Sequence, residues 1–132
     1  MILKFNDERF KERILGGLKI HNLRTDRTER WKKGQKIHFW LGDPKDMKVT
    51  PKPHQFHEAN CSSVQKVEIT FSDSEQFPMS VIVDNVYLNG AEMEELALSD
   101  GFDDLGHMAE WFMDYTPKGF KGRLIHWTKK KY

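Results

Sequence analysis

The chain has 132 residues, which suits one domain with one hydrophobic core. No apolar run approaches the ~20 residues that cross a bilayer, and the first residues, Met1 to Phe5, are too short and too soon charged for a signal peptide. The single cysteine permits no internal disulfide. We therefore expect a cytoplasmic protein with no membrane partner.

The net charge of +1 conceals three blocks of opposite sign. Residues 1–60 carry 14 Lys/Arg and 8 Asp/Glu, residues 61–117 carry 1 and 12, and residues 118–132 carry 6 and none. Such blocks are typical of a protein with one face turned toward a polyanion. The alternative is that the opposite blocks pair with each other in the fold.

Residues 7–15 are predicted to form the first helix. Asn6 is a suitable N-cap, and Phe5 and Phe10 occupy the positions of a hydrophobic staple. Gly16 and the glycine after it are expected to end the helix.

The next segment, 19–24, has the composition of a strand with polar side chains on both faces. Because side chains alternate along a strand, one face would carry Lys19, His21 and Leu23, and the other Ile20, Asn22 and Arg24. Lys19 and Arg24 are either solvated surface cations, as most such residues are, or the cations of a ligand site.

The remaining elements follow from hydrophobic periodicity. Strands are predicted at 2–5, 36–41, 64–72, 80–88 and 122–128, and helices at 91–99 and 104–115. Three prolines make 42–63 an irregular loop, either a functional flap or a mobile excursion. Six strands and about three helices without a βαβ rhythm predict an α+β fold, a small β-barrel or strongly curved mixed sheet with the helices packed on it.

Four segments, in this order and spacing, resemble the ASCH family, whose fold is similar to the PUA domain. They are Gly17-x-Lys19-x-x-Asn22-x-Arg24, the turn and strand at 31–38, the stretch 100–112 and the stretch 120–128. The resemblance covers most of the chain and implies a single PUA-like domain over 1–132, with no cofactor and no metal.

In the acetylcytidine amidohydrolase branch of that family, the resemblance implies a catalytic Lys, Thr and Glu. These positions fall on Lys19, Asn22 and Asp100 of this sequence. A carboxamide is not a nucleophile as a Thr hydroxyl is, and Asp is shorter than Glu by one methylene. These two departures, Asn22 for Thr and Asp100 for Glu, favour a pocket that binds its ligand over one that hydrolyses it.

Ligand-binding roles are expected for the same three residues and for Arg24 and Trp111. Asn22 offers a donor and an acceptor to a base edge, Arg24 could hold a phosphate or carboxylate with its planar fork, and an exposed Trp111 could stack on a base. Asp100 could instead only end a helix or stabilise a turn.

The spacing His54-x-x-His57-x-x-x-Cys61 invites a zinc interpretation. A fourth ligand would have to come from a distant residue, so we expect no metal there.

These observations leave three hypotheses. The first is a module that binds RNA or a nucleotide or nucleoside ligand in a cleft between barrel and helices. The second is a small hydrolase, either an amidohydrolase on a modified nucleoside or a ribonuclease. The third is a protein-interaction module. Neither the ligand nor the oligomeric state follows from the sequence.

Overall fold

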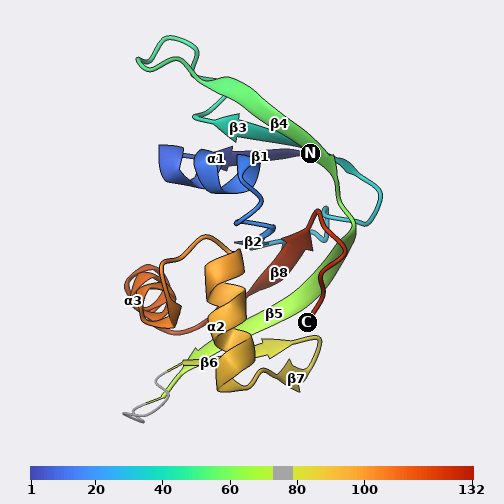
Figure 1. The fold of residues 1–132 in the computed structure, drawn as a ribbon, viewed down its shortest axis with the longest axis vertical. Helices are drawn as coiled ribbons and strands as arrows, with labels where there is room; N and C mark the ends of the chain where they lie inside the picture. The colour runs from blue at the N-terminus through green and yellow to red at the C-terminus, as the bar shows by residue number, and fades with distance from the viewer. Residues whose placement is uncertain (73–78) are drawn as a thin grey trace.

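The computed structural model describes residues 1–72 and 79–132 and has an α+β fold with two sheets and three helices in that part of the chain (Figure 1). The helices are α1 (Glu8–Leu15), α2 (Gly90–Ser99) and α3 (Leu105–Tyr115). The strands are β1 (Ile2–Phe5), β2 (His21–Arg24), β3 (Lys36–Leu41), β4 (His54–Asn60), β5 (Ser63–Phe71), β6 (Met79–Val83), β7 (Val86–Tyr87) and β8 (Phe120–His126).

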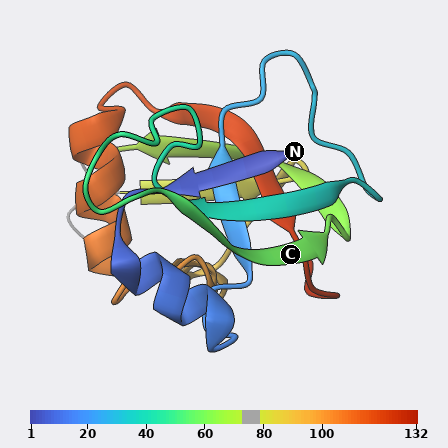
Figure 2. The ribbon, with the colours of Figure 1, turned by 90° about the horizontal axis from the view of Figure 1, so that it is seen from above.

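The smaller sheet has the order β1-β3-β4. β1 pairs with β3 in parallel, with Ile2 opposite His38, and β3 pairs with β4 antiparallel. Figure 2 shows β1 and β3 side by side in this sheet. The sheet is therefore mixed, as the sequence predicted.

The larger sheet is antiparallel in the order β2-β8-β5-β6-β7. β4 leads directly into β5, so the chain passes from one sheet to the other along one side of the molecule (Figure 1). The predicted strand at 80–88 is divided into β6 and β7 because Asp84 and Asn85 adopt positive φ angles of 48° and 66° in the turn between them.

The two sheets are separate in the described residues and close no barrel, so the structure shows the mixed class but not a barrel. Each sheet has its own hydrophobic cluster. β8 contributes to both, because Leu124 packs in the cluster of the larger sheet and its neighbour Ile125 packs in that of the smaller one. This strand therefore joins the two halves of the core.

Two local predictions were wrong. The N-cap of α1 is Asp7, whose side chain accepts a hydrogen bond from the Arg9 backbone, rather than Asn6. The range 42–63 contains β4 and the start of β5, so the long irregular stretch is 42–53, and only residues 61 and 62 separate the two strands. β4 was missed because its polar residues show no apolar alternation, and it is defined instead by its pairing with β3.

None of the described helices is both long and apolar enough to cross a membrane.

Candidate ligand pocket

A pocket of about 470 Å³ lies between the start of α1, strand β2 and helix α3. All five residues that the sequence singled out for ligand contact line it: Lys19, Asn22, Arg24, Asp100 and Trp111. They come from three separate segments of the chain, which the fold brings together.

The turn after α2 places Asp100 beside Lys19. Asp100 is the C-cap of α2, and the carbonyl of the preceding Ser99 accepts a hydrogen bond of 2.9 Å from the backbone of Ile20. Gly101 follows with φ +97°, and a Cβ atom there would lie 3.2 Å from Cδ of Lys19. Glycine is required here both for the left-handed backbone and for the close approach.

Lys19 is almost completely buried, with 1% of its surface exposed. Its Nζ donates hydrogen bonds to the carbonyls of His21 (2.9 Å) and Asp100 (2.5 Å) and lies 3.4 Å from Oδ1 of Asp100. Burial lowers the pKa of Lys19, and the Asp100 carboxylate partly opposes that shift. The positive charge of Lys19 is therefore compensated by the Asp100 carboxylate inside the protein and is not presented to solvent.

Asp100 also forms the first link of a buried polar chain that the sequence did not predict. Its Oδ1 lies 2.9 Å from Nδ1 of His21, and Nε2 of His21 lies 2.8 Å from the Tyr132 hydroxyl. Since a carboxylate only accepts, the bond assigns the proton to Nδ1, and the Tyr132 hydroxyl must donate to Nε2. Burial raises the pKa of Tyr132 to about 12, which keeps that hydroxyl protonated.

A second buried histidine lies against this chain. The ring of His126 meets that of His21 edge to face at 5.3 Å, and its Nε2 donates to Oε1 of Gln65 at 2.9 Å. Its Nδ1 is buried without a hydrogen-bond partner in the described residues. Burial and the nearby His21 lower the pKa of His126 to about 4.

The hydroxyl of Tyr132 is expected to contribute measurably to stability, because without it Nε2 of His21 is a buried acceptor with no donor. Tyr132→Phe should lower the free energy of unfolding by about 1–3 kcal/mol in a urea titration. The matched control is Tyr87→Phe, because Tyr87 is 70% exposed, and it should change stability by less than about 0.5 kcal/mol. Equal effects of the two changes would mean that the Tyr132 bond does not contribute.

Arg24 differs from the other charged residues of the pocket. Lys4 is paired with Asp43 at 3.4 Å, Asp7 with Arg9 at 2.8 Å, and Lys19 with Asp100. Within the described residues, Arg24 has no carboxylate within 4.0 Å, and its guanidinium donates only to the Lys4 carbonyl at 2.8 Å. Burial lowers the pKa of Arg24, so the pocket holds one partly desolvated, uncompensated cation.

Asn22 lines the pocket beside Arg24 and is half-buried. In the part of the chain that the structure describes, its carboxamide forms no hydrogen bond. Asn22 and Arg24 share a face of β2, as predicted, while His21 points into the interior. Lys19 reaches the same pocket because β2 begins only at His21, so strand alternation does not govern its direction.

The opposite wall is aromatic. Rings follow one another from the core outward, with centroids 5.3 Å apart for Phe120 and Phe112, 4.9 Å for Phe112 and Trp111, and 5.0 Å for Trp111 and Tyr115. The series ends on exposed rings, because Trp111 is 46% and Tyr115 is 65% exposed. A planar ligand entering the pocket would meet these faces.

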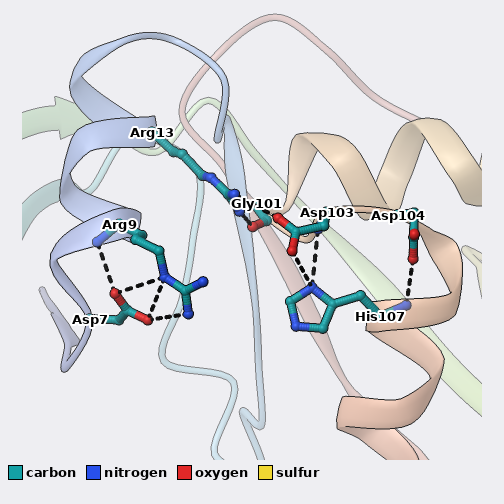
Figure 3. A network of polar contacts seen from close by, with 7 residues as sticks. All are labelled: Asp7, Arg9, Arg13, Gly101, Asp103, Asp104 and His107. Carbon is teal, nitrogen blue, oxygen red and sulfur yellow. Dashed lines mark hydrogen bonds and ion pairs between the residues drawn. The ribbon is translucent and has the colours of Figure 1, made fainter.

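Arg13 ties helix α1 to the turn before α3. Figure 3 shows its side chain reaching from α1 to the turn before α3, where it donates to the carbonyl of Gly101 and to Oδ1 of Asp103 at 2.8 Å. The Asp103 backbone in turn donates to Nδ1 of His107, in the first turn of α3, at 3.1 Å. The pocket is therefore held between helices that are tied to each other.

The three residues of the zinc interpretation are engaged separately. Nε2 of His54 lies 3.1 Å from Nζ of Lys11, the ring of His57 lies 5.2 Å from that of Phe39, and Sγ of buried Cys61 donates to the Ser63 carbonyl. Among the described residues, no group of three His, Cys, Asp or Glu is arranged to hold a metal ion.

Opposite charge blocks do pair in places, for example Lys130 with Glu95 at 2.5 Å and Lys121 with Glu68 at 4.0 Å. Part of the basic C-terminal block is therefore compensated within the fold.

Comparison with known proteins finds no matching family model, no matching curated protein and no matching solved structure.

Proposed function

We propose that this protein is a cytoplasmic ASCH-type module with a PUA-like architecture, and that it binds RNA or a nucleotide-derived ligand in the pocket beside β2. The observation that carries the proposal is the uncompensated guanidinium of Arg24, which faces a pocket with an aromatic wall. A nucleotide combines the two features that such a pocket would recognise, an anionic phosphate and a planar base.

The phosphate belongs at Arg24. An arginine fork matches the geometry of phosphate oxygens and forms charge-assisted hydrogen bonds with them. Burial disfavours the charge of Arg24, so an anion bound there would compensate a charge that no carboxylate of the described residues balances.

The base belongs between Asn22 and the aromatic wall. The carboxamide of Asn22 has both a donor and an acceptor free for a base edge, and stacking on an aromatic ring contributes about 1–3 kcal/mol per base. The volume of about 470 Å³ is within the ordinary range of small-ligand pockets.

Binding is favoured over hydrolysis by the contacts of the catalytic candidates. Nζ of Lys19 is engaged by two backbone carbonyls, and the Asp100 carboxylate by His21 and Lys19. We therefore expect the protein to deacetylate acetylcytidine slowly or not at all, and Asn22→Thr to raise the rate by restoring a hydroxyl. Product analysis by chromatography measures the rate. If the unaltered protein deacetylates acetylcytidine rapidly and Asn22→Ala keeps that rate, a hydrolase with a different catalytic set is favoured.

The binding proposal is tested by calorimetric titration with the four 5′-ribonucleoside monophosphates and the matching nucleosides. At least one nucleotide should bind, more tightly than its nucleoside and more weakly as salt is raised. Arg24→Gln should weaken that binding by about 10- to 100-fold, as expected for a lost charge-assisted hydrogen bond.

The matched control is Arg27→Gln, which removes the same charge from an exposed arginine outside the pocket. It should leave the affinity within about twofold. The proposal is overturned if no nucleotide binds, or if Arg24→Gln binds as well as Arg27→Gln. In that case, a protein-interaction module becomes the leading interpretation.

A further inference from the structure

We infer that the site is built for single-stranded nucleic acid of at least two nucleotides, with one base in the pocket, the linking phosphate at Arg24 and the next base stacked on Tyr115 at the pocket rim. This inference rests on the proposed function and specifies its ligand. It goes beyond a mononucleotide because the aromatic series extends past the pocket into solvent.

The rim is a stacked pair of exposed rings. Trp111 and Tyr115 are one turn apart on α3, with ring centroids 5.0 Å apart and planes inclined by only 29°. Tyr115 is 65% exposed and Trp111 is 46% exposed. Large exposed aromatic surfaces are informative in a folded protein, since burial is their usual state.

The pair is continuous with the interior of the site. Both rings line the same pocket as Arg24 and Asn22, and Trp111 contacts the buried rings of Phe112 and Phe102 at 4.9 and 6.0 Å. A base stacked on the exposed ring of Tyr115 would thus extend the stacked pair of Trp111 and Tyr115, which rests on buried rings of the core.

The charge of the rim suits a phosphodiester. Arg24 and Tyr115 both line the pocket, so the cation and the ring at the rim belong to one site. A phosphate that links two nucleotides carries one negative charge, which matches the one uncompensated cation that the described lining residues present.

The occupant must be single-stranded. A base can stack on a protein ring only when it is released from its own stack and pair, which is how proteins read single strands rather than duplexes. RNA and DNA single strands share this chemistry, so the test includes both.

The test compares a nucleoside 5′-monophosphate with the dinucleotide that carries adenosine on the same phosphate, using the base that binds best in the pocket. The adenosine should increase the affinity of the full-length protein by about 5- to 100-fold through stacking. Tyr115→Ala should remove that gain, Tyr115→Phe should keep it, and Tyr87→Ala, a change of an exposed tyrosine on β7, should leave it unaltered.

The ratio of the two affinities is the readout, because a general loss of folding lowers both together. The inference is overturned, and the proposed function kept, if the monophosphate binds but adenosine adds nothing or its gain survives Tyr115→Ala. If neither ligand binds, the inference and the proposed function are both overturned.

The deoxy dinucleotide should show the same gain in affinity from adenosine if stacking is the source of that gain. A gain confined to RNA would contradict stacking as the cause. A single-stranded oligonucleotide long enough to form a stable duplex should bind more tightly than the same strand annealed to its complement, and equal affinities would also overturn the inference.

Discussion

Lys19→Met is expected to destabilise the protein by about 3–5 kcal/mol, because it removes one partner of a buried ion pair and leaves the other uncompensated. Lys19 is 1% exposed, and its Nζ contacts two backbone carbonyls and the Asp100 carboxylate. Methionine fills a similar volume but donates no hydrogen bond to any of them. Urea unfolding followed by tryptophan fluorescence measures the change.

Two further variants identify the cause. Lys4→Met removes a lysine that is 45% exposed and paired with Asp43, and should cost no more than about 1 kcal/mol. Asp100→Asn introduced with Lys19→Met removes the uncompensated charge, so the double variant should be more stable than Lys19→Met alone. A well-folded Lys19→Met protein of unaltered stability would show that the pair is not formed in solution.

From the sequence, Lys19 was either a solvated surface cation or a cation of a ligand site. The structure shows a buried lysine whose Nζ is met by two carbonyls and a carboxylate. Convergence of segments 81 residues apart cannot be read from composition.

Acid is expected to destabilise the protein steeply between pH 6.5 and 4 through His126. Its pKa is lowered from 6.5 to about 4 in the folded state, so above pH 6.5 the ring is neutral whether or not the chain is folded. Between pH 6.5 and 4, His126 is protonated in the unfolded chain but stays neutral in the folded protein, so the free energy of unfolding decreases as the pH falls through this range. At 1.36 kcal/mol per pKa unit, His126 alone accounts for a loss of about 3 kcal/mol.

The main cause is burial of the ring. The added proton would go on Nδ1, which has no hydrogen-bond acceptor among the described residues. Burial also lowers the pKa of His21, so His21 adds to the effect of His126. His126→Gln should therefore reduce the slope of the free energy of unfolding against pH by up to about 1.4 kcal/mol per pH unit.

His54→Gln is the matched control, because it makes the same substitution at an exposed histidine. Free energies of unfolding from urea titrations at half-unit intervals from pH 4 to 7 give the three slopes. A parallel set of curves for His126→Gln and the unaltered protein would contradict a neutral, buried His126.

Local signals predicted most of the elements. The strands at Ile2–Phe5 and Lys36–Leu41 have the predicted bounds, and the glycine after α1 ends that helix as its C-cap. These features depend on capping, turn chemistry and apolar periodicity, which lie within a few residues of each other in the chain.

The sequence singled out residues of one pocket, and their role in ligand binding stays a prediction. Lys19, Asn22, Arg24, Asp100 and Trp111 do line one pocket, yet the His21, His126 and Tyr132 network behind it was missed. One signal was present, since a histidine stood on a strand where neither face was cleanly apolar. Its partners Asp100 and Tyr132 are 79 and 111 residues away, so only the packed fold shows what satisfies it.

The most direct test of the central proposal is a crystal structure of the protein with the 5′-nucleotide that binds best in solution. We expect a phosphate oxygen within about 2.7–2.9 Å of the Arg24 guanidinium, and the base between Asn22 and the ring of Trp111. A nucleotide bound elsewhere on the surface, with the pocket beside β2 filled by solvent, would contradict the proposal.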